Sequence, residues 1–192
     1  MSTLSLDTTP FFQLRNLETL PIIANINGRL FGEVVREAVR SVHAAKTKYY
    51  ELLDSPVKTR MQSRIIHNLH PVACCPMDLD AQAQVYLVEC TSGDESILKV
   101  GMTSNFNKRF ARGVPYKVKP LLLSKQISAG DAHVVEQAVL KLLFGQFVSP
   151  RKYFTGHTEC VVNSRRSKVI VSQGMKLAYA HNFELSLSQG VV

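Results

Sequence analysis

The chain of 192 residues is 45% hydrophobic and 20% charged, and its mean hydropathy is +0.00. It has too few glycines and prolines for a fibrous or disordered protein, no apolar run of the roughly 18 residues that span a membrane, and enough length for one domain plus an extension. The net charge is +8, and residues 1–80 carry 9 Lys and Arg against 8 Asp and Glu while residues 81–192 carry 14 against 7. The basic second half favours a nucleic-acid partner over a basic surface kept only for solubility.

The first thirty residues show no sustained period, and the N-terminus lacks the basic and long apolar segments of a secretion signal. We therefore expect a cytoplasmic protein, or a nuclear one in a eukaryote. From Phe31 to Leu53 apolar residues recur every three or four positions until Pro56, which predicts one amphipathic helix. A second, shorter helix is predicted over residues 57–69.

A group of metal-ligand residue types follows this second predicted helix. His67, His70, Cys74 and Cys75 stand within one short segment, which is the composition of a zinc site. Structural zinc sites usually use two separated ligand pairs, so ordinary thiols and surface histidines are the favoured interpretation and zinc is the weaker one. The four cysteines of the chain form no CxxC pair, which fits a reducing compartment.

The sequence pattern changes near residue 80, where we place a boundary between a helical region, 1–80, and a second domain, 81–192. The near-neutral charge of the first region favours protein contact, such as a homodimer or another partner, over DNA binding. In the second region, residues 84–90 and 97–101 are short β-rich runs that predict a hairpin. A strand over 119–127 would complete a three-stranded antiparallel sheet, so the predicted fold class is α+β with helices flanking this sheet.

A short helix is predicted between the hairpin and the third strand. Thr103 or Ser104 would cap its N-terminus and Gly113 would end it. Phe106 and Phe110 would face inward, and the basic side chains of this helix would remain available for binding.

The next predicted helix, residues 131–147, carries a carboxylate in an apolar stripe. At about 100° per residue, Glu136 shares a face with Ala132, Val139 and Leu143. A lone buried carboxylate is costly, so it must stay neutral, meet a cation, or line a cleft that metal and substrate reach. The plain structural alternative is an ion pair with Arg109 or with another basic side chain.

The last part of the chain predicts a strand and a helix. Residues 156–162 are expected to form the strand, and Ser164 can cap a final helix that ends near Asn182.

In this order, the motifs resemble the GIY-YIG nuclease superfamily over about residues 83–165, most closely a phage-associated branch. Val85-Tyr86-Leu87 stands where the first strand motif would be and Lys99-Val100-Gly101 where the second would be. Arg109 falls eight residues after Gly101, and Glu136 lies on the later helix. Lys99 stands where the second motif has a tyrosine, and the first motif lacks its glycine.

The resemblance implies a role in phosphodiester hydrolysis for each motif residue. Tyr86 would assist deprotonation of a water if nearby cations, such as Lys99, lower its pKa from about 10. Arg109 would bind the phosphate with its planar guanidinium, and Glu136 would hold a single Mg²⁺ ion. His133, one turn before Glu136, is a candidate proton shuttle, although a surface histidine is the favoured interpretation.

Each role has a structural alternative. Tyr86 would be a core aromatic, Arg109 a solvated helix residue, and Glu159 a cap or an ion-pair partner. Further basic residues are expected to contact the nucleic-acid backbone without reading sequence. They are Lys108, Arg112, Lys117, Lys119, Arg151, Lys152, Arg165 and Arg166.

Two functions follow from the sequence. The first is a magnesium-dependent DNA endonuclease, a hydrolase of phage or mobile-element type, with RNA as the other candidate substrate. The second is a catalytically inactive GIY-YIG-like module that binds nucleic acid or a protein partner. The two differ in what Glu136 does.

Overall fold

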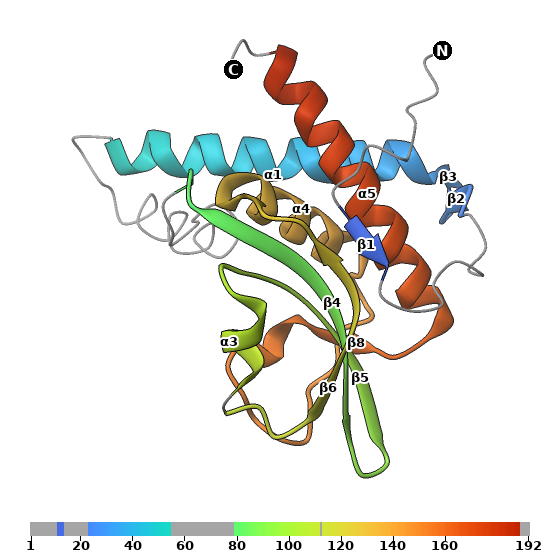
Figure 1. The fold of residues 1–192 in the computed structure, drawn as a ribbon. Helices are drawn as coiled ribbons and strands as arrows, with labels where there is room; N and C mark the ends of the chain where they lie inside the picture. The colour runs from blue at the N-terminus through green and yellow to red at the C-terminus, as the bar shows by residue number, and fades with distance from the viewer. Residues whose placement is uncertain (1–10, 14–22, 55–78, 112, 189–192) are drawn as a thin grey trace.

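The computed structural model describes residues 11–13, 23–54, 79–111 and 113–188 (Figure 1). The predicted helix at 57–69, the four candidate zinc ligands and Arg112 lie outside these residues. None of the described helices has the length and hydropathy needed to cross a lipid bilayer.

An antiparallel sheet forms the centre of the molecule. Its strands run in the order β1-β6-β4-β5-β8, and the short strand β7 pairs with the start of β4. The bounds are β1 Phe11–Gln13, β4 Gln82–Ser92, β5 Glu95–Thr103, β6 Lys117–Ser124, β7 Ile127–Ser128 and β8 Cys160–Val162. The predicted hairpin and third strand are therefore confirmed as β4, β5 and β6.

The prediction of only three strands is wrong, because β1 and β8 extend the sheet at its two edges. β1 pairs with β6 and β8 pairs with β5. β1 has three residues, which is too short for a period-2 pattern to stand out in the sequence, whereas β8 lies within a segment predicted as a strand. The segment predicted as a strand at 156–162 is a 3-10 turn, η2 His157–Glu159, followed by β8.

Both faces of the sheet are covered, so the middle residues of the central strands are buried. Val85 and Leu87 of β4 belong to a large core beneath the long helices, whereas Tyr86 and Val88 belong to a smaller core on the other face. A strand that is buried on both faces reads as a continuous apolar run, as residues 85–88 do. The register of β4 against β6 shifts between Leu87 and Val88, next to Pro120, which has no N–H to donate.

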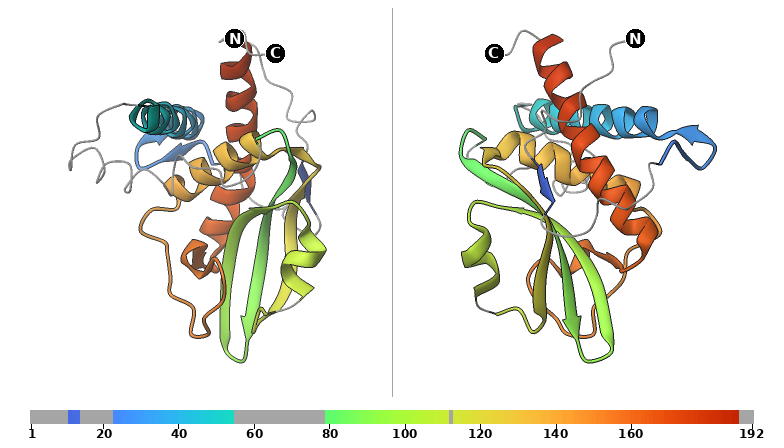
Figure 2. Two further views of the ribbon diagram at one scale, coloured as in Figure 1. Left: turned by 90° about the vertical axis from the view of Figure 1, so that its left-hand side faces the viewer. Right: turned by 45° about the vertical axis from the view of Figure 1, so that its right-hand side comes forward.

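Three helices pack over the large core: α1 Phe31–Asp54, α4 Ala129–Leu142 and α5 Arg165–Ser188. Figures 1 and 2 show them together at one end of the molecule, with the sheet extending away from them. The predicted helix at 31–53 is confirmed as α1. It follows the two-stranded ribbon of β2 Asn25–Ile26 and β3 Arg29–Leu30, and it contributes Val35, Val39 and Val42 to the same core as α4 and α5. The division near residue 80 stays a prediction.

The helix ends follow local capping. The Ser164 hydroxyl accepts a hydrogen bond from the Ser167 N–H before α5, as predicted. At the start of α4 the Ser128 hydroxyl accepts one from the Asp131 N–H. The predicted end of α4 at residue 147 is wrong, because the helix stops at Leu142 and Gly145 adopts a φ of 79°. α5 runs to Ser188, beyond the predicted end near Asn182.

The short helix α3, Phe106–Ala111, lies on the face of the smaller core. Its cap is Asn105 rather than Thr103 or Ser104, because the Asn105 side-chain oxygen accepts from the Lys108 N–H at 2.9 Å. The Thr103 hydroxyl instead accepts from the Asn105 N–H. Gly113 follows the helix with a φ of 79°.

Candidate functional site

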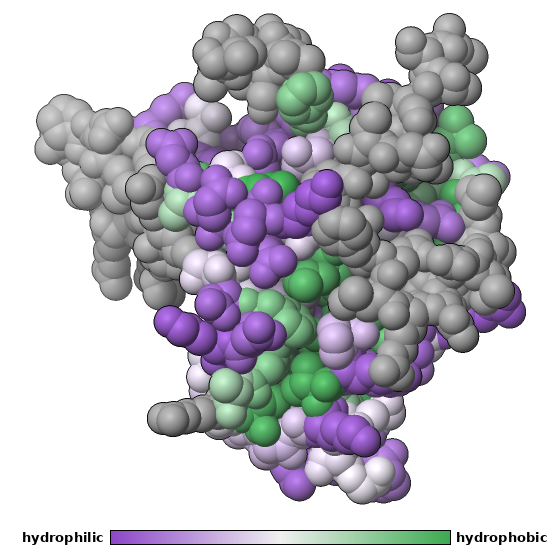
Figure 3. Space-filling model, viewed as in Figure 1, coloured by the Kyte–Doolittle hydropathy of each residue, from purple (hydrophilic) through white to green (hydrophobic). Residues whose placement is uncertain are grey.

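The candidate site lies on the sheet face that α3 covers. Phe106 and Phe110 meet the ring of Tyr86 edge-on, with ring centroids 5.7 and 5.2 Å away, so their predicted inward orientation is confirmed. Figure 1 shows α3 and the segment between α4 and β8 on the lower half of the sheet, away from the long helices. Figure 3 shows apolar surface between hydrophilic side chains on this half.

Tyr86 is held in place by the residue opposite it. It pairs with Gly101 in the β4–β5 register and is only 1% exposed. A Cβ atom at Gly101 would lie 2.6 Å from Cζ of Tyr86, closer than real Cβ contacts. The glycine is therefore required for the ring to lie across β5.

Lys99 is fully buried, two residues before Gly101 on the same strand, and its charge is compensated locally. Its Nζ donates to the carbonyl oxygen of Gly156 and to Oε2 of Glu159, both at 2.6 Å. The alternative that Glu159 is an ion-pair partner is confirmed. Lys99 thus ties β5 to the turn that precedes β8.

Arg109 on α3 reaches the same turn from the other side. Its Nη2 donates to the Thr155 carbonyl at 3.2 Å, and its guanidinium also hydrogen-bonds the Tyr86 phenol. Gly156 lies between the side chains of Lys99 and Arg109. A Cβ atom at this position would lie 2.8 Å from Nζ of Lys99 and 2.9 Å from Nη2 of Arg109, and the φ of Gly156 is 80°. Only glycine suits both this space and this backbone conformation.

Glu136 approaches from α4, and it is 6% exposed. Burial first, and the negative charge of Glu159 second, raise its pKa to about 7, while Lys99 and the backbone of Met102 on β5 act in the opposite direction. Among the described residues no ion pair joins Glu136 to a base, so the suggested pairing with Arg109 is wrong. The contact with the Met102 backbone places the carboxylate at the end of β5, beside the groups above.

Tyr86 is also electrically linked to this group. Burial raises the pKa of its phenol well above the usual value, although Arg109 lowers it and Glu159 and Glu136 raise it further. Arg109 is therefore the cation that lowers the pKa of the Tyr86 phenol, whereas Lys99 forms its ion pair with Glu159. We call these five side chains the carboxylate–phenol cluster. They are Tyr86, Lys99, Arg109, Glu136 and Glu159.

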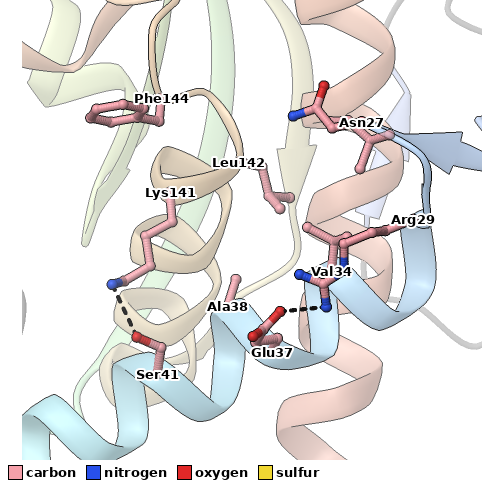
Figure 4. A pocket seen from close by; sticks show the side chains of 10 residues that line it. Asn27, Arg29, Val34, Glu37, Ala38, Ser41, Lys141, Leu142 and Phe144 are labelled. Carbon is pink, nitrogen blue, oxygen red and sulfur yellow. Dashed lines mark hydrogen bonds and ion pairs between the residues drawn. The ribbon is translucent and has the colours of Figure 1, made fainter.

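Two hollows differ in their relation to the cluster. A hollow of about 130 Å³ between α3 and the loop after α4 is lined by Lys99 and Arg109, together with Phe154 and Thr155. A larger cavity of about 500 Å³ lies between α1 and α4 (Figure 4), where Lys141 donates to Ser41. None of the residues that line this larger cavity belongs to the cluster. Choosing the site by cavity volume alone would therefore miss the titratable groups.

The remaining predicted site residues lie around the cluster or apart from it. His133 is buried on α4, so its interpretation as a surface histidine is wrong, and the shuttle role stays a prediction. Lys119 and Glu89 form a weak ion pair at 3.8 Å. The other described basic residues are exposed; they are Lys108 on α3, Lys117 at the start of β6, Arg151 and Lys152 in the loop before η2, and Arg165 and Arg166 at the start of α5.

Sequence reasoning missed the backbone of the turn at 154–156. The carbonyls of Thr155 and Gly156 hold Arg109 and Lys99 in place, and no side-chain pattern signals a carbonyl acceptor. The glycine at 156 was the available signal, because it has a positive φ beside two bases.

No preformed cage for a metal ion lies among the described residues. Among them no group of three or more His, Cys, Asp and Glu side chains lies close enough to hold a metal. Mg²⁺ commonly keeps several waters and binds through one or two carboxylates plus substrate phosphate. Glu136 is one such carboxylate, although burial and the charge of Glu159 oppose its ionisation.

Comparison with known proteins adds one finding. A family model described as the T5orf172 domain matches residues 83–169, which run from β4 to the start of α5 and include the whole cluster. It is a phage-associated domain from the context of GIY-YIG/HNH-like endonucleases, and it indicates a nuclease-like or DNA-binding function. No curated protein and no solved structure matches the chain. Membership of the GIY-YIG superfamily stays a prediction.

Proposed function

We propose that the protein is a magnesium-dependent DNA endonuclease of GIY-YIG type. The observation that carries the proposal is the convergence of a phenol, two bases and two carboxylates, from four separate elements and the η2 turn, at one end of β5. These groups are far apart in the sequence, and packing alone does not require them to meet. Perturbed titratable groups that gather in this way are a general sign of a functional site.

Arg109 is the group in this cluster best suited to bind the phosphate. Its side chain is partly exposed and lines the hollow beside Thr155. A guanidinium presents a planar set of donors that matches two phosphate oxygens, and it stays charged at any working pH. Its hydrogen bonds to the Thr155 carbonyl and the Tyr86 phenol fix its orientation before a substrate arrives.

Glu136 would hold the metal ion, and Glu159 would stay with Lys99. The Lys99–Glu159 pair has a 2.6 Å contact, so Lys99 neutralises one of the two carboxylates and leaves Glu136 as the uncompensated one. A bound Mg²⁺ ion would polarise the phosphate and favour formation of the attacking hydroxide. Tyr86, whose phenol is held protonated by burial, would orient a water by hydrogen bonding.

A second candidate function rests on that same phenol. With its pKa raised well above the usual value and its side chain 1% exposed, Tyr86 is a poor base. Lys99 also stands where the resembled motif has a tyrosine. A domain that binds DNA without cutting it would have both features.

One experiment separates these two functions. The full chain is incubated with supercoiled plasmid in Mg²⁺ and in EDTA, beside Glu136→Gln and Arg109→Ala. Glu33→Gln and Arg36→Ala, which change exposed residues of α1, are the matched controls. The endonuclease predicts Mg²⁺-dependent nicking that the first two variants lose and the controls keep. Plasmid binding without nicking in any of the five proteins would support the binding domain instead.

A further inference from the structure

An aromatic ring stands in solvent on the loop that borders the candidate site. Tyr153 is 79% exposed, and its ring lies against the His157 ring with centroids 4.4 Å apart and an interplanar angle of 49°. Tyrosine commonly buries its ring and exposes only the hydroxyl. Here one face of the ring is supported by the imidazole and much of the remainder is open to solvent.

The loop that carries this ring is anchored. Phe154, the next residue, is buried against the ring of Tyr116, with centroids 5.5 Å apart. The Lys152 N–H donates to the Tyr116 hydroxyl at 3.0 Å, and that hydroxyl donates to Glu95 at 2.7 Å. Because the backbone on both sides of Tyr153 is held, ordering the ring for binding costs little conformational entropy.

The anchored ring is also close to the proposed phosphate position. Tyr153 stands two residues before Thr155, whose carbonyl accepts from Arg109, so their Cα atoms are at most about 7 Å apart. One strand of DNA rises about 3.4 Å per nucleotide. With the Tyr153 side chain and the Arg109–Thr155 hydrogen bond added to this distance, the ring is within a few nucleotides of a phosphate bound by Arg109.

Positive charge flanks the ring. Arg151 and Lys152 precede it and are exposed, and Lys108 is exposed next to Arg109 on α3. Arg151 forms an ion pair with Asp94, also exposed, and such a pair contributes little and exchanges readily with another anion. Exposed aromatic rings flanked by basic side chains form the usual surface for unpaired nucleic acid. The nucleobases stack on the rings, and the basic side chains contact the phosphates.

We propose that Tyr153, supported by His157, is a stacking site for an unpaired nucleobase next to the phosphate held by Arg109. The position of that phosphate rests on the proposed function. A base inside a continuous duplex has both faces covered by its neighbours, so the ring selects DNA in which a nucleotide is free. The substrate class is therefore single-stranded, flapped or gapped DNA in preference to intact duplex.

The test measures binding separately from cleavage. The full chain with Glu136→Gln is titrated, in EDTA, into a 2-aminopurine oligonucleotide, either alone or annealed to its complement. The chain contains no tryptophan, so the protein does not interfere with this fluorophore. The variants are Tyr153→Ala and Tyr153→Phe, and Phe144→Ala is the matched control because Phe144 is 88% exposed and lies beside a different cavity.

We expect quenching of the probe in the single strand, and Tyr153→Ala to weaken single-strand binding about ten-fold, equivalent to about 1.4 kcal/mol. Tyr153→Phe and Phe144→Ala should bind as the parent does, and duplex binding should change less than about two-fold. Equal losses on both DNA forms, no loss on either, or no binding of any oligonucleotide would overturn the inference.

Failure of the proposed function has a different signature. In that case the wild-type chain cuts no DNA in Mg²⁺, while the Tyr153-dependent binding of the single strand remains. If instead the wild-type chain nicks plasmid and Tyr153→Ala treats both DNA forms alike, the endonuclease stands and the stacking site is wrong.

Discussion

Tyr86 on β4 lies directly opposite Gly101 on β5, and its ring covers the position where a side chain at residue 101 would begin. The added Cβ of Gly101→Ala would lie 2.6 Å from Cζ of Tyr86, so the ring or the strand must move. We expect this variant to lose about 1–3 kcal/mol of unfolding free energy, measured by urea denaturation. It should also lose nicking activity, because the displaced phenol no longer meets Arg109.

Gly32→Ala is the control for this prediction. A Cβ at Gly32, in the first turn of α1, meets nothing within 4 Å, so we expect unchanged or slightly raised stability. A Gly101→Ala protein with wild-type stability and wild-type nicking would show that the close packing at Tyr86 has no role.

The ion pair of Lys99 and Glu159 predicts an asymmetric response to mutation. Lys99→Met leaves the Glu159 carboxylate and the Gly156 carbonyl without their buried donor, so we expect a loss of about 3–5 kcal/mol. Glu159→Gln should cost at least as much, because it leaves the fully buried Lys99 ammonium with only neutral acceptors, whereas the Glu159 carboxylate is partly exposed. Urea denaturation of both variants at pH 7 measures the difference.

Lys119→Met is the matched control, because Lys119 is partly exposed and its Nζ lies 3.8 Å from Oε2 of Glu89. An exposed pair of this kind contributes about 1 kcal/mol or less. If Lys99→Met were no more destabilising than Lys119→Met, the buried pair would not hold the turn before β8 in place.

The central hairpin, α1 and the helix cap at Ser164 could be predicted because their signals are local. Apolar periodicity gives a strand or a helix, and a serine before a helix gives a cap. Burial of Glu136 was predictable for the same reason, since the apolar stripe of its helix fixes which side faces inward. Gly145, which ends α4, was the local signal that a periodicity argument overlooked.

The partners within the site could not be predicted, because they depend on contacts between distant segments. Nothing in the sequence near Lys99 indicates that its ammonium meets Glu159 or the Gly156 carbonyl. The same holds for strand β1, whose three residues are specified by the edge of β6, and for the pairing of β8 with β5. The resemblance over 83–165 supplied the set of residues, and the fold supplied their geometry.

Glu136 predicts a stability that falls as pH rises. Its folded-state pKa of about 7 lies above its ordinary value of 4.5, so between these pH values the folded protein binds more protons than the unfolded chain. The stability that the protonated form contributes is fully present below pH 4.5 and is lost as pH rises through 7, by about 3 kcal/mol. Denaturation midpoints of wild type and Glu136→Gln, measured from pH 4.5 to 8, test this sign.

The two proteins should be similarly stable at pH 4.5, and Glu136→Gln should be the more stable one at pH 8. Glu33→Gln, an exposed carboxylate on α1, serves as the control and should follow the wild type at every pH. A constant difference between Glu136→Gln and the wild type across this range would mean that Glu136 titrates as an exposed carboxylate does.

Magnesium should offset the unfolding free energy that the wild-type protein loses as Glu136 ionises at high pH. A cation bound by Glu136 stabilises the folded state by about 2.7 kcal/mol at 100 times its dissociation constant, so at pH 8 the wild-type melting temperature should rise with Mg²⁺. Glu136→Gln should show no such rise, and NaCl at equal ionic strength should not reproduce it. An equal rise in both proteins would place the ion elsewhere on the chain.

Arg109→Lys tests whether the geometry of the guanidinium, and not its charge alone, is needed. Lysine keeps the positive charge but cannot bind two phosphate oxygens in one plane while donating to Thr155 and Tyr86. We expect plasmid binding within about three-fold of wild type and single-turnover nicking at least about a hundred-fold slower, the scale of one lost transition-state donor. Lys108→Ala, an exposed neighbour on α3, should show the opposite pattern, with weaker binding that depends on salt and a nearly unchanged rate at saturation. An Arg109→Lys protein that nicks at the wild-type rate would show that Arg109 contributes only its positive charge.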